Sequence, residues 1–542
     1  MAFKLFLFFL FLSGTSAFAK EWILKVEASA IYGKKGVKPT FQNGHNFKVL
    51  SFLKEQKAAL VLIDSGFSKE VILDNPSVLS IEENSPLFVN QYFKKASNFS
   101  FEDNLFHHQW SIKNVGGRDH WGQLASEKAS IHVEKVWNEG VVGSRAIVVA
   151  VIDSGVDIDH PDLRDNIFLN EREVPNNGID DDNNGFVDDV HGWNFVNNNN
   201  NVSDPLGHGT HCAGVIGASG RDEKGIKGIN WDVSILPISY LNKNNKGNLA
   251  NAILSIDYAI KMGANIINAS WGGAKSNSIR DVIEKAEKKG ILFVSSAGND
   301  AENLDVFPYY PASYGLLNMI TVASTTQLDK ILGDSNWGKL SVDLGAPGAH
   351  ILSTVPNGRY AYMSGTSMAA PHVAGAAALL WSSDPHLSYL DIKKMLVRSV
   401  DMLGTSFLNQ LKAGGRVNVN RAFKKKFNNF PAKLWKKEKY ILNSPTPLPV
   451  GFYKSYKIRV PGAKGIRVHF KSIDLIPGRE RLLVGTSEYL IMEKWEKKNQ
   501  SGTSIDISGE NLYLKVISDL ISSDEKDREQ GQGFSIDFIE HF

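Results

Sequence analysis

Three polar side chains with complementary chemistry, Asp153, His208 and Ser367, stand in glycine-rich settings along the chain. Ser367 follows Gly365-Thr366 and precedes a run of small apolar residues, which indicates a hydroxyl at the start of a buried helix. A helix N-terminus offers unbonded N–H groups and a positive dipole end, which suit a nucleophile whose attack builds negative charge nearby. A serine that only caps the helix would give the same local pattern.

Asp153 ends a strongly apolar segment, and His208 lies between two glycines. A turn aspartate and a capping histidine are the structural alternatives. A hydroxyl, an imidazole and a carboxylate are nevertheless the three groups that an acyl-transfer site requires. They are 55 residues (208 − 153) and 159 residues (367 − 208) apart, so only the fold can bring them together. The spacing alone leaves open whether His208 or His211 reacts.

The segment around these residues alternates apolar strands with helical patterns, which predicts an α/β fold with a mostly parallel sheet and helices on both faces. Sites in such sheets gather at the carboxyl ends of the strands. The expected strands cover 146–152, 233–238, 266–270, 291–295 and 319–323, and the expected helices cover 248–262 and 279–289.

Residues 151–156, 208–214 and 365–372 resemble the three active-site blocks of the subtilisin-like serine peptidases, or subtilases. The resemblance extends over about residues 105–423. It implies a serine endopeptidase in which Asp153 orients the imidazole, His208 acts as general base and then acid, and Ser367 is the nucleophile. It also selects His208 over His211.

Two further segments carry the same resemblance. Asn299, in the Ser-Ser-Ala-Gly-Asn-Asp run, matches the family's oxyanion-hole asparagine, which would act together with the backbone N–H of Ser367. The family's substrate-binding edge, where an extended peptide adds as a strand, is matched by Ser270, Trp271, Gly272, Gly273, Ala297 and Gly298. No acidic cluster marks a pocket for paired basic residues, so we expect broad specificity.

An acidic stretch at 177–189 resembles the first nine positions of an EF-hand-type calcium loop. His191 stands where a bidentate Glu would be, so a helix-flanked EF-hand is not expected. A solvated acidic loop is the alternative, but calcium is common in inserted loops of subtilases. The expected Ca²⁺ ligands are Asp180, Asp182, Asn184, the carbonyl of Phe186, and Asp188.

Composition and the N-terminal residues bear on partners and location. The net charge is +2 in 542 residues, which does not favour nucleic acid or an anionic membrane as a partner. Residues 1–19 read as a signal peptide cut after Ala19, and no later stretch is apolar enough to span a membrane. We therefore expect a secreted protein, extracellular, periplasmic or at the cell surface. The single cysteine, Cys212, is expected to be a buried apolar residue.

Two outer segments flank the peptidase domain expected at 105–425. Residues 20–95 read as a small α+β module that resembles the inhibitory propeptide of the family, with strands at 22–26, 58–63 and 77–84 and a helix or turn at 69–73. Cleavage is expected between Asn90 and Asn104. Residues 430–542 read as a β-sandwich with a CUB-like or a jelly-roll fold.

The sequence thus predicts a self-processing secreted endopeptidase with protein or peptide substrates and its own propeptide as partner. Two other classes remain as alternatives. A secreted binding protein could use the peptidase fold as a scaffold, but such a protein is expected to lack part of the triad. A metallopeptidase could use His208 and His211, but the Glu of the zinc-binding helix is absent.

Overall fold

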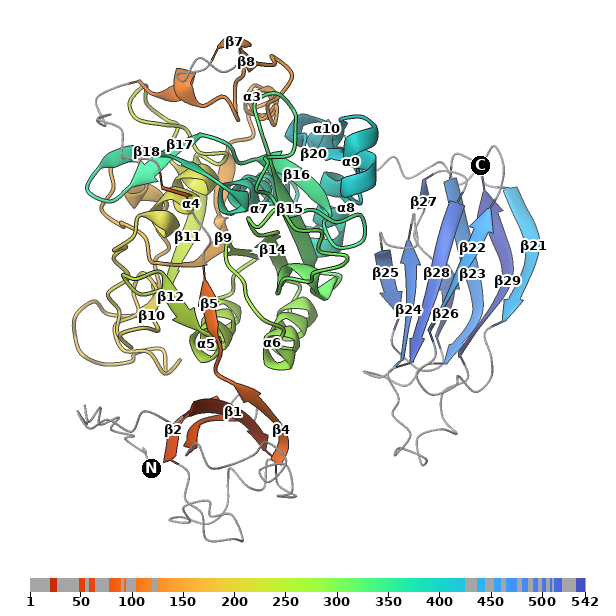
Figure 1. The fold of residues 1–542 in the computed structure, drawn as a ribbon, viewed down its shortest axis with the longest axis horizontal. Coiled ribbons are helices and arrows are strands. Elements are labelled where there is room, and N and C mark those ends of the chain that lie inside the picture. Colours follow the sequence, from red (N-terminus) through yellow and green to blue (C-terminus); the bar gives the residue numbers. More distant parts are fainter. Residues whose placement is uncertain are drawn as a thin grey trace. The chain divides into compact units, whose positions relative to one another are not determined.

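The fold is taken from a computed structural model, which describes residues 20–26, 48–53, 58–63, 78–88, 92–93, 104–118, 124–424 and the strands β21 to β29 between residues 436 and 541 (Figure 1). The expected signal peptide, the helix or turn at 69–73 and most of the cleavage window between Asn90 and Asn104 lie outside the described residues. The chain divides into two compact units, residues 1–86 with 248–250, and residues 87–247 with 251–542.

The first unit contains an antiparallel four-stranded sheet in the order β2-β3-β1-β4. Leu24 faces Ala59 on one neighbouring strand and Ile81 on the other. Ile23, Leu24, Val61 and Ile81 are buried, so apolar residues of three strands form the centre of this sheet. The strands are β1 (Lys20–Val26), β2 (Lys48–Leu53), β3 (Ala58–Ile63) and β4 (Val78–Glu83).

The second unit is organised by a nine-stranded sheet, which is parallel except for its last strand pair, β20 and β19. Its central strands are apolar on both sides because both of their faces are buried. This confirms the α/β prediction. The strands in spatial order are β10 (Trp193–Asn194), β11 (Asp232–Ser239), β9 (Gly143–Asp153), β13 (Ile266–Ala269), β14 (Leu292–Ser296), β15 (Met319–Thr325), β16 (Leu344–Pro347), β20 (Gly415–Arg416) and β19 (Asp401–Met402).

Two core helices lie side by side on this sheet, α4 (His208–Gly217) and α7 (Thr366–Ser383) (Figure 1). Every residue of α4 and residues 366–381 of α7 are buried, so neither helix has a solvent face. Gly375 lies at this contact, where a Cβ would crowd Ile229, 3.0 Å from its Cδ1, and would reach the Cα of Ile216 on α4 at 3.4 Å. The other helices are α3 (Glu134–Trp137), α5 (Leu249–Lys261), α6 (Asn277–Lys288), α8 (Tyr389–Arg398), α9 (Thr405–Gln410) and α10 (Val419–Lys424).

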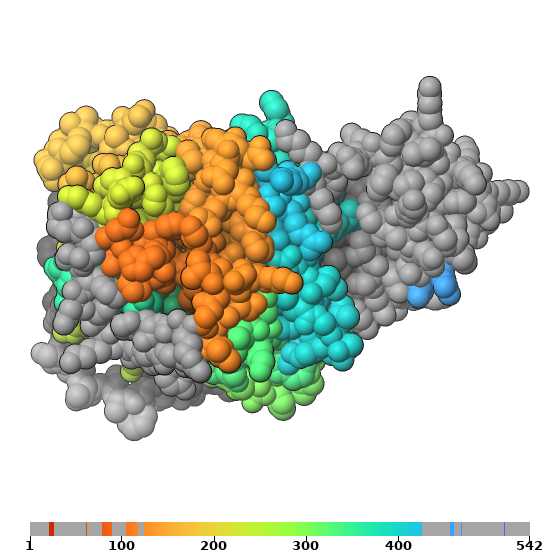
Figure 2. Space-filling view, turned by 90° about the horizontal axis from the view of Figure 1, so that it is seen from above, coloured from red at the N-terminus to blue at the C-terminus, as the bar shows by residue number. Residues whose placement is uncertain are grey.

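The beginning and end of this α/β region meet on one face. Figure 2 shows residues near 130, in orange, beside residues near 420, in cyan. The N–H of Val419 donates to the carbonyl of Ile131 over 2.9 Å, and buried Arg416 donates to the carbonyl of Ser130 over 2.8 Å. Arg416 also pairs with Asp329 and Asp401, so its buried charge is balanced.

Smaller elements complete the described chain. Strand β18 (Arg359–Ser364) pairs with β17 (Ile351–Val355) and with β6 (Tyr92–Phe93). The remaining short elements are β5 (Pro86–Phe88), β7 (Gly117–Arg118), β8 (Leu124–Ala125), β12 (Lys246–Asn248), η2 (Phe106–His108), η3 (Arg164–Asn166) and η4 (Ala312–Tyr314).

The described strands after residue 435 form two antiparallel sheets, in the orders β21-β29-β23-β26 and β22-β28-β24-β25, with β27 paired to β23. Whether they form a CUB-like domain stays a prediction. Among the residues that the structure describes, no helix has the length and apolarity needed to cross a bilayer. The strands are β21 (Lys436–Asn443), β22 (Tyr453–Arg459), β23 (Gly465–Asp474), β24 (Glu480–Gly485), β25 (Ile491–Trp495), β26 (Gln500–Thr503), β27 (Ile507–Ser508), β28 (Asn511–Ser518) and β29 (Gly533–His541).

Candidate active site

The three residues singled out by their chemistry lie at the ends of core elements. Asp153 is the last residue of β9, His208 is the first residue of α4, and Ser367 is the second residue of α7. All three side chains are almost completely buried. Since α4 and α7 pack on each other and both contact β9, the core itself brings these termini together.

Asp153 and His208 form a short, fully buried hydrogen bond. Nδ1 of His208 lies 2.6 Å from Oδ1 of Asp153, and that oxygen also accepts from the N–H of Ser154 over 2.8 Å. Holding Nδ1 on the carboxylate leaves Nε2 as the ring nitrogen available for a proton. Nε2 is buried and has no hydrogen-bond partner among the described residues.

Asp204 was missed by the sequence analysis, and it ties the Asp153 loop to α4. One carboxylate oxygen accepts from the hydroxyl of Ser154 over 2.7 Å and from the N–H of Gly207 over 2.8 Å, and the other accepts from the N–H and hydroxyl of Thr210. Gly207, the residue before the helix, has no side chain to cap it, so Asp204 supplies the acceptor. An acidic residue shortly before a predicted helix start was the available signal.

Pro371 changes the hydrogen bonding of the Ser367 carbonyl. Proline has no N–H, so the carbonyl four residues earlier, that of Ser367, receives no helical hydrogen bond from it. That carbonyl instead accepts from Oγ of Ser270 over 3.1 Å and from Sγ of Cys212 over 3.4 Å. The hydroxyl of Ser367 donates to the carbonyl of Ser270 over 3.3 Å. Cys212 is one turn beyond His208 on α4, so this contact links the helix of the imidazole to the serine.

Asn299 lies beside the start of α7. Its Oδ1 accepts from the N–H of Thr366 over 2.8 Å and from the hydroxyl of Thr366 over 3.0 Å. The same hydroxyl accepts from the N–H of Gly298 over 3.1 Å. Thr366 therefore fixes which end of the Asn299 amide carries the oxygen, and it was not among the predicted site residues.

The other buried histidines of this region are neutral and bound to carbonyls. Nε2 of His211 lies 3.0 Å from the carbonyl of Ile351, and burial lowers its pKa to about 3. Nδ1 of His372 lies 2.8 Å from the carbonyl of Met368, and burial lowers its pKa to about 4. Of these histidines and His208, only His208 is hydrogen-bonded to Asp153 in the described part of the chain, so the geometry agrees with the choice of His208.

The predicted substrate edge follows β13 and β14. Gly272 exchanges two backbone hydrogen bonds with Phe88, of 3.1 and 3.2 Å, and Gly273 exchanges two with Tyr310. Phe88 and Gly272 both belong to the second unit. Trp271 is turned inward, where its indole N–H donates to the carbonyl of Ile152. The edge thus accepts an added extended segment, while the Trp271 side chain packs in the core.

The acidic loop brings together a set of carboxylates that differs in part from the predicted one. Ligand oxygens of Glu173, Asp182 and Asp189 all lie within 4.8 Å of one another. Asp180 instead accepts from the N–H groups of Asn184 and Gly185, and Asp188 accepts from those of Asn177 and Gly178. Both of these aspartates shape turns of the loop.

Two observations indicate that this acidic cluster fits a cation. Glu173 is buried, and its Oε2 has no hydrogen-bond partner among the described residues. Burial raises the pKa of Asp189, and the neighbouring charge of Asp182 adds to the rise. The loop is anchored to α5, because Phe186 packs against Tyr258 of that helix and the hydroxyl of Tyr258 donates to Asp189 over 2.6 Å.

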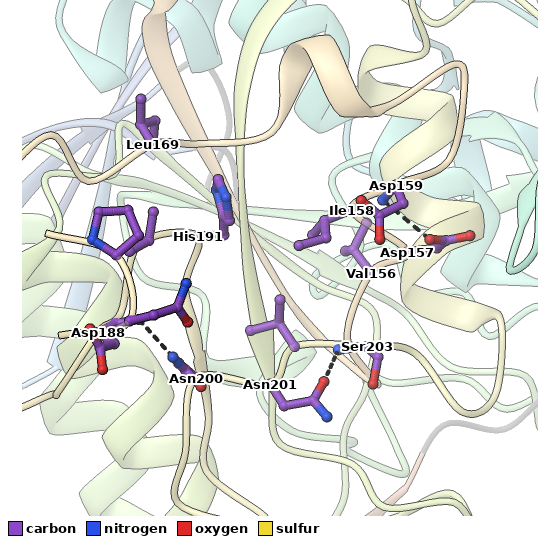
Figure 3. Close-up of a pocket in the computed structure, with 14 residues that line it drawn as sticks. Val156, Asp157, Ile158, Asp159, Leu169, Asp188, His191, Asn200, Asn201 and Ser203 are labelled. Carbon is purple, nitrogen blue, oxygen red and sulfur yellow. Dashed lines mark hydrogen bonds between the residues drawn. The ribbon is translucent and has the colours of Figure 1, made fainter. Parts of the chain in front are cut away.

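A separate pocket of about 420 Å³, lined by apolar and polar side chains, lies between the loop after β9 and the acidic loop (Figure 3). Asp157, Asp188, His191 and Ser203 are among its lining residues, and Asn200 donates to the carbonyl of Asp188 at its wall. None of the three predicted triad residues lines this pocket. This pocket is therefore not the candidate active site.

Comparison with known proteins gives the same assignment as the geometry. The model of a family described as the subtilase family matches residues 144–424, more than half of the chain. The match covers Asp153, His208, Asn299 and Ser367.

Several curated proteins are similar to this chain. Subtilisin-like protease 1 of Plasmodium berghei is 34% identical over 64% of this chain and 59% of its own length. The cell wall-associated protease of Bacillus subtilis is 32% identical over 68% of this chain and 37% of its own length. Thermitase of Thermoactinomyces vulgaris is 36% identical over 51% of this chain and 87% of its own length. The match to the Plasmodium protein leaves about two fifths of that protein uncovered.

Proposed function

Because this chain belongs to the subtilase family, we propose that it is a serine endopeptidase that cleaves protein or peptide substrates through an acyl-enzyme. The observation that carries the proposal is the buried 2.6 Å contact between Asp153 and His208 beside a serine at a helix N-terminus. Asp153 orients the imidazole, His208 is the general base, and Ser367 is the nucleophile.

In the proposed reaction Oγ of Ser367 attacks the scissile carbonyl while its proton passes to Nε2 of His208. The negative charge on the carbonyl oxygen is stabilised by the N–H of Ser367, in the first turn of α7, and by the amide of Asn299, which lies beside the start of that helix. His208 then protonates the leaving amine, and water hydrolyses the ester by the same route. The substrate lies as an added strand along Gly272 and Gly273, with Ser270, Trp271, Ala297 and Gly298 forming the edge around it.

Replacement of the nucleophile tests this proposal. Ser367→Ala should lower casein hydrolysis by about 10⁶-fold, because the triad acts as a unit. Ser382→Ala, at the other end of α7, is the control and should leave the rate unchanged. A Ser367→Ala enzyme that retains the wild-type rate would contradict the mechanism and favour a scaffold protein with a contaminating protease.

The same site is proposed to process its own precursor after export. Two described segments of the second unit flank the nucleophile in the intact chain: Phe88 pairs with Gly272, and Tyr92 pairs with Ser364, three residues before Ser367. These two pairings bracket Ser367 between Phe88 and Tyr92, and Asn90–Gln91 is the first bond of the expected window inside this bracket. The carbonyl of Ser270 accepts from the Ser367 hydroxyl.

We therefore place the cut at the Asn90–Gln91 bond, at the start of the window expected from the sequence. Residues 89–91 lie outside the described residues, so the assignment rests on the flanking register. The exported wild type should begin at Gln91, and exported Ser367→Ala should begin at Lys20. An identical N-terminus for both proteins would refute self-processing, and a start elsewhere would refute the proposed bond.

Calcium is proposed as a structural ion in the acidic loop. Glu173, Asp182 and Asp189 supply clustered oxygens, and Asn184 lies beside Asp189, to which its side chain donates over 3.0 Å. Ca²⁺ prefers carboxylate and carbonyl oxygens, and it would balance the buried charge of Glu173 and Asp189. Of the ligands expected from sequence, Asp182 and Asn184 belong to this set.

A further inference from the structure

The gap beside the nucleophile is bounded by two backbone segments, residues 270–273 and 297–299. Both follow neighbouring parallel strands, β13 and β14, and so leave the same edge of the sheet. Each contacts the start of α7, since Ser270 bonds with Ser367 and Asn299 bonds with Thr366. The side chain next to a scissile carbonyl would therefore enter between these two segments.

Tyr309 lies in this gap. A Cβ built on Gly272 would be 2.4 Å from Cε1 of Tyr309, and one built on Gly298 would be 3.1 Å from its Cδ1. The same edge of the ring therefore packs on the backbone of both segments. A side chain at Gly272 would collide with the ring, and one at Gly298 would crowd both the ring and Nδ2 of Asn336.

Hydrogen bonds of Tyr309 and of the next residue hold the backbone of this segment in place. The next residue, Tyr310, exchanges backbone hydrogen bonds of 2.7 and 3.1 Å with Gly273. The N–H of Tyr309 itself donates to the hydroxyl of Ser313 over 3.2 Å. Burial raises the pKa of Tyr309, so the ring is a neutral, bulky filler of the gap. The backbone bridge at Tyr310 ties this segment to the substrate edge.

We propose that Tyr309 is a specificity-determining residue that restricts the scissile-carbonyl residue of the substrate to a small side chain. The inference rests on the proposed function and narrows the broad specificity expected from sequence. Glycine, alanine, serine and asparagine fit beside the ring, whereas leucine and phenylalanine compete with it for the same space.

The experiment compares kcat/KM for peptides that differ only at this residue, with Ala, Asn, Leu or Phe. The wild type should prefer Ala over Phe by about 10- to 200-fold, the range that pocket size supplies. Tyr309→Ala should shift the Phe-to-Ala ratio by at least about tenfold toward Phe. Tyr309→Phe, which keeps the ring, and Tyr310→Ala, which changes the neighbouring side chain, should leave the ratio unchanged.

Cleavage of the Ala peptide shows that each variant is folded. The preference of the wild type between the Ala and Phe peptides tests the inference without any substitution in the protein. A wild type that cleaves the Phe peptide as well as the Ala peptide overturns the inference, as does an unchanged ratio in Tyr309→Ala. In both cases the peptidase proposal stands. A wild type that cleaves no peptide overturns both proposals.

Discussion

The Asp153–His208 cluster and the acidic loop around Asp182 both bury carboxylates, but they balance the charge in different ways. In the first cluster Asp153 accepts from His208 and Ser154, and Asp204 accepts from five donors on the surrounding turn and helix. In the second, Glu173 keeps an unpartnered oxygen near two other carboxylates. Each cluster keeps one buried oxygen without a partner among the described residues, Oδ2 of Asp153 and Oε2 of Glu173. The first lies beside an imidazole, whereas the second lies beside two carboxylates, of which Asp182 pairs with the exposed Arg172. The second arrangement is the one that the proposed cation would balance.

This difference follows from where the two clusters are built. The first joins the ends of β9, α4 and α7, whose buried residues set its geometry. The second is formed by residues 170–189, where local turns hold Asp180 and Asp188 on backbone amides. We therefore expect activity and stability at the active site to fall when its hydrogen-bonding residues are replaced. We expect the stability of the loop to fall when the proposed calcium ion is removed.

Removal of Asp204 should have the largest effect on stability. Asp204→Ala leaves buried donors on Ser154, Gly207 and Thr210 without an acceptor, which should cost about 3 kcal/mol of unfolding free energy. His208 should also lose its alignment with Asp153, so kcat should fall by about 10-fold or more, with KM little changed. Urea unfolding and peptide kinetics measure the two effects, with exposed Asp159→Ala as control. Equal losses in both variants would show that Asp204 has no special positioning role.

Calcium removal should give the next largest effect, and only at the loop. At a free Ca²⁺ concentration of 100 times Kd, binding contributes about 2.7 kcal/mol, so chelator should lower the melting temperature by several degrees. Glu173→Gln should weaken this response, whereas Glu171→Gln, on an exposed neighbouring side chain, should retain it. An equal chelator response in wild type and Glu173→Gln would exclude Glu173 as a ligand.

The predictability of each site from sequence depends on how locally it is encoded. Asp153, His208 and Ser367 were identifiable because each stands in its own glycine-rich motif. Asp204 and Thr366 were not, since their partners lie on other segments and only the fold shows which donors they meet. Glu173 and Asp189, which lie beside Asp182, are outside the predicted ligand set because the calcium-loop pattern was applied at alternate positions. The loop instead folds back on residues 170–173, and its pattern residues Asp180 and Asp188 serve the turns.

The same reasoning applies to the fold. The strands of the parallel sheet were predictable because burial on both faces leaves continuous apolar runs, as in β9 and β15. The spatial order of those strands was not predictable from periodicity. Nor was the pairing of β6 with β18, because a two-residue strand carries no repeating pattern.

Acid should destabilise the core through its buried histidines. Burial lowers the pKa of His372 to about 4, against an ordinary value of 6.5, so the unfolded chain binds the proton first as pH falls. The stability from the neutral ring is complete above pH 6.5 and is lost progressively down to about pH 4, by at most about 1.4 kcal/mol per pH unit.

Urea unfolding at pH 7.5 and pH 5 measures this effect. The fall in stability should be smaller in His372→Gln, which keeps a side-chain donor without titrating. His386→Gln, on an exposed residue, should match the wild type. If the wild type and His372→Gln lose the same amount of stability between pH 7.5 and pH 5, His372 is not the cause of the loss.

Cys212 should give the smallest energetic effect because it is a secondary donor to the Ser367 carbonyl. Ser270 donates to the same carbonyl at 3.1 Å, so Cys212→Ala should cost about 1 kcal/mol and change kcat less than twofold. Burial raises the pKa of the Cys212 thiol, so it should not react with a bulky disulfide reagent until the protein unfolds. Cys212→Ala carrying Ser203→Cys, on an exposed loop, should react at once. Rapid reaction of native wild type would show that α4 opens at the candidate active site, and the rigidity inferred from its buried contacts would be wrong.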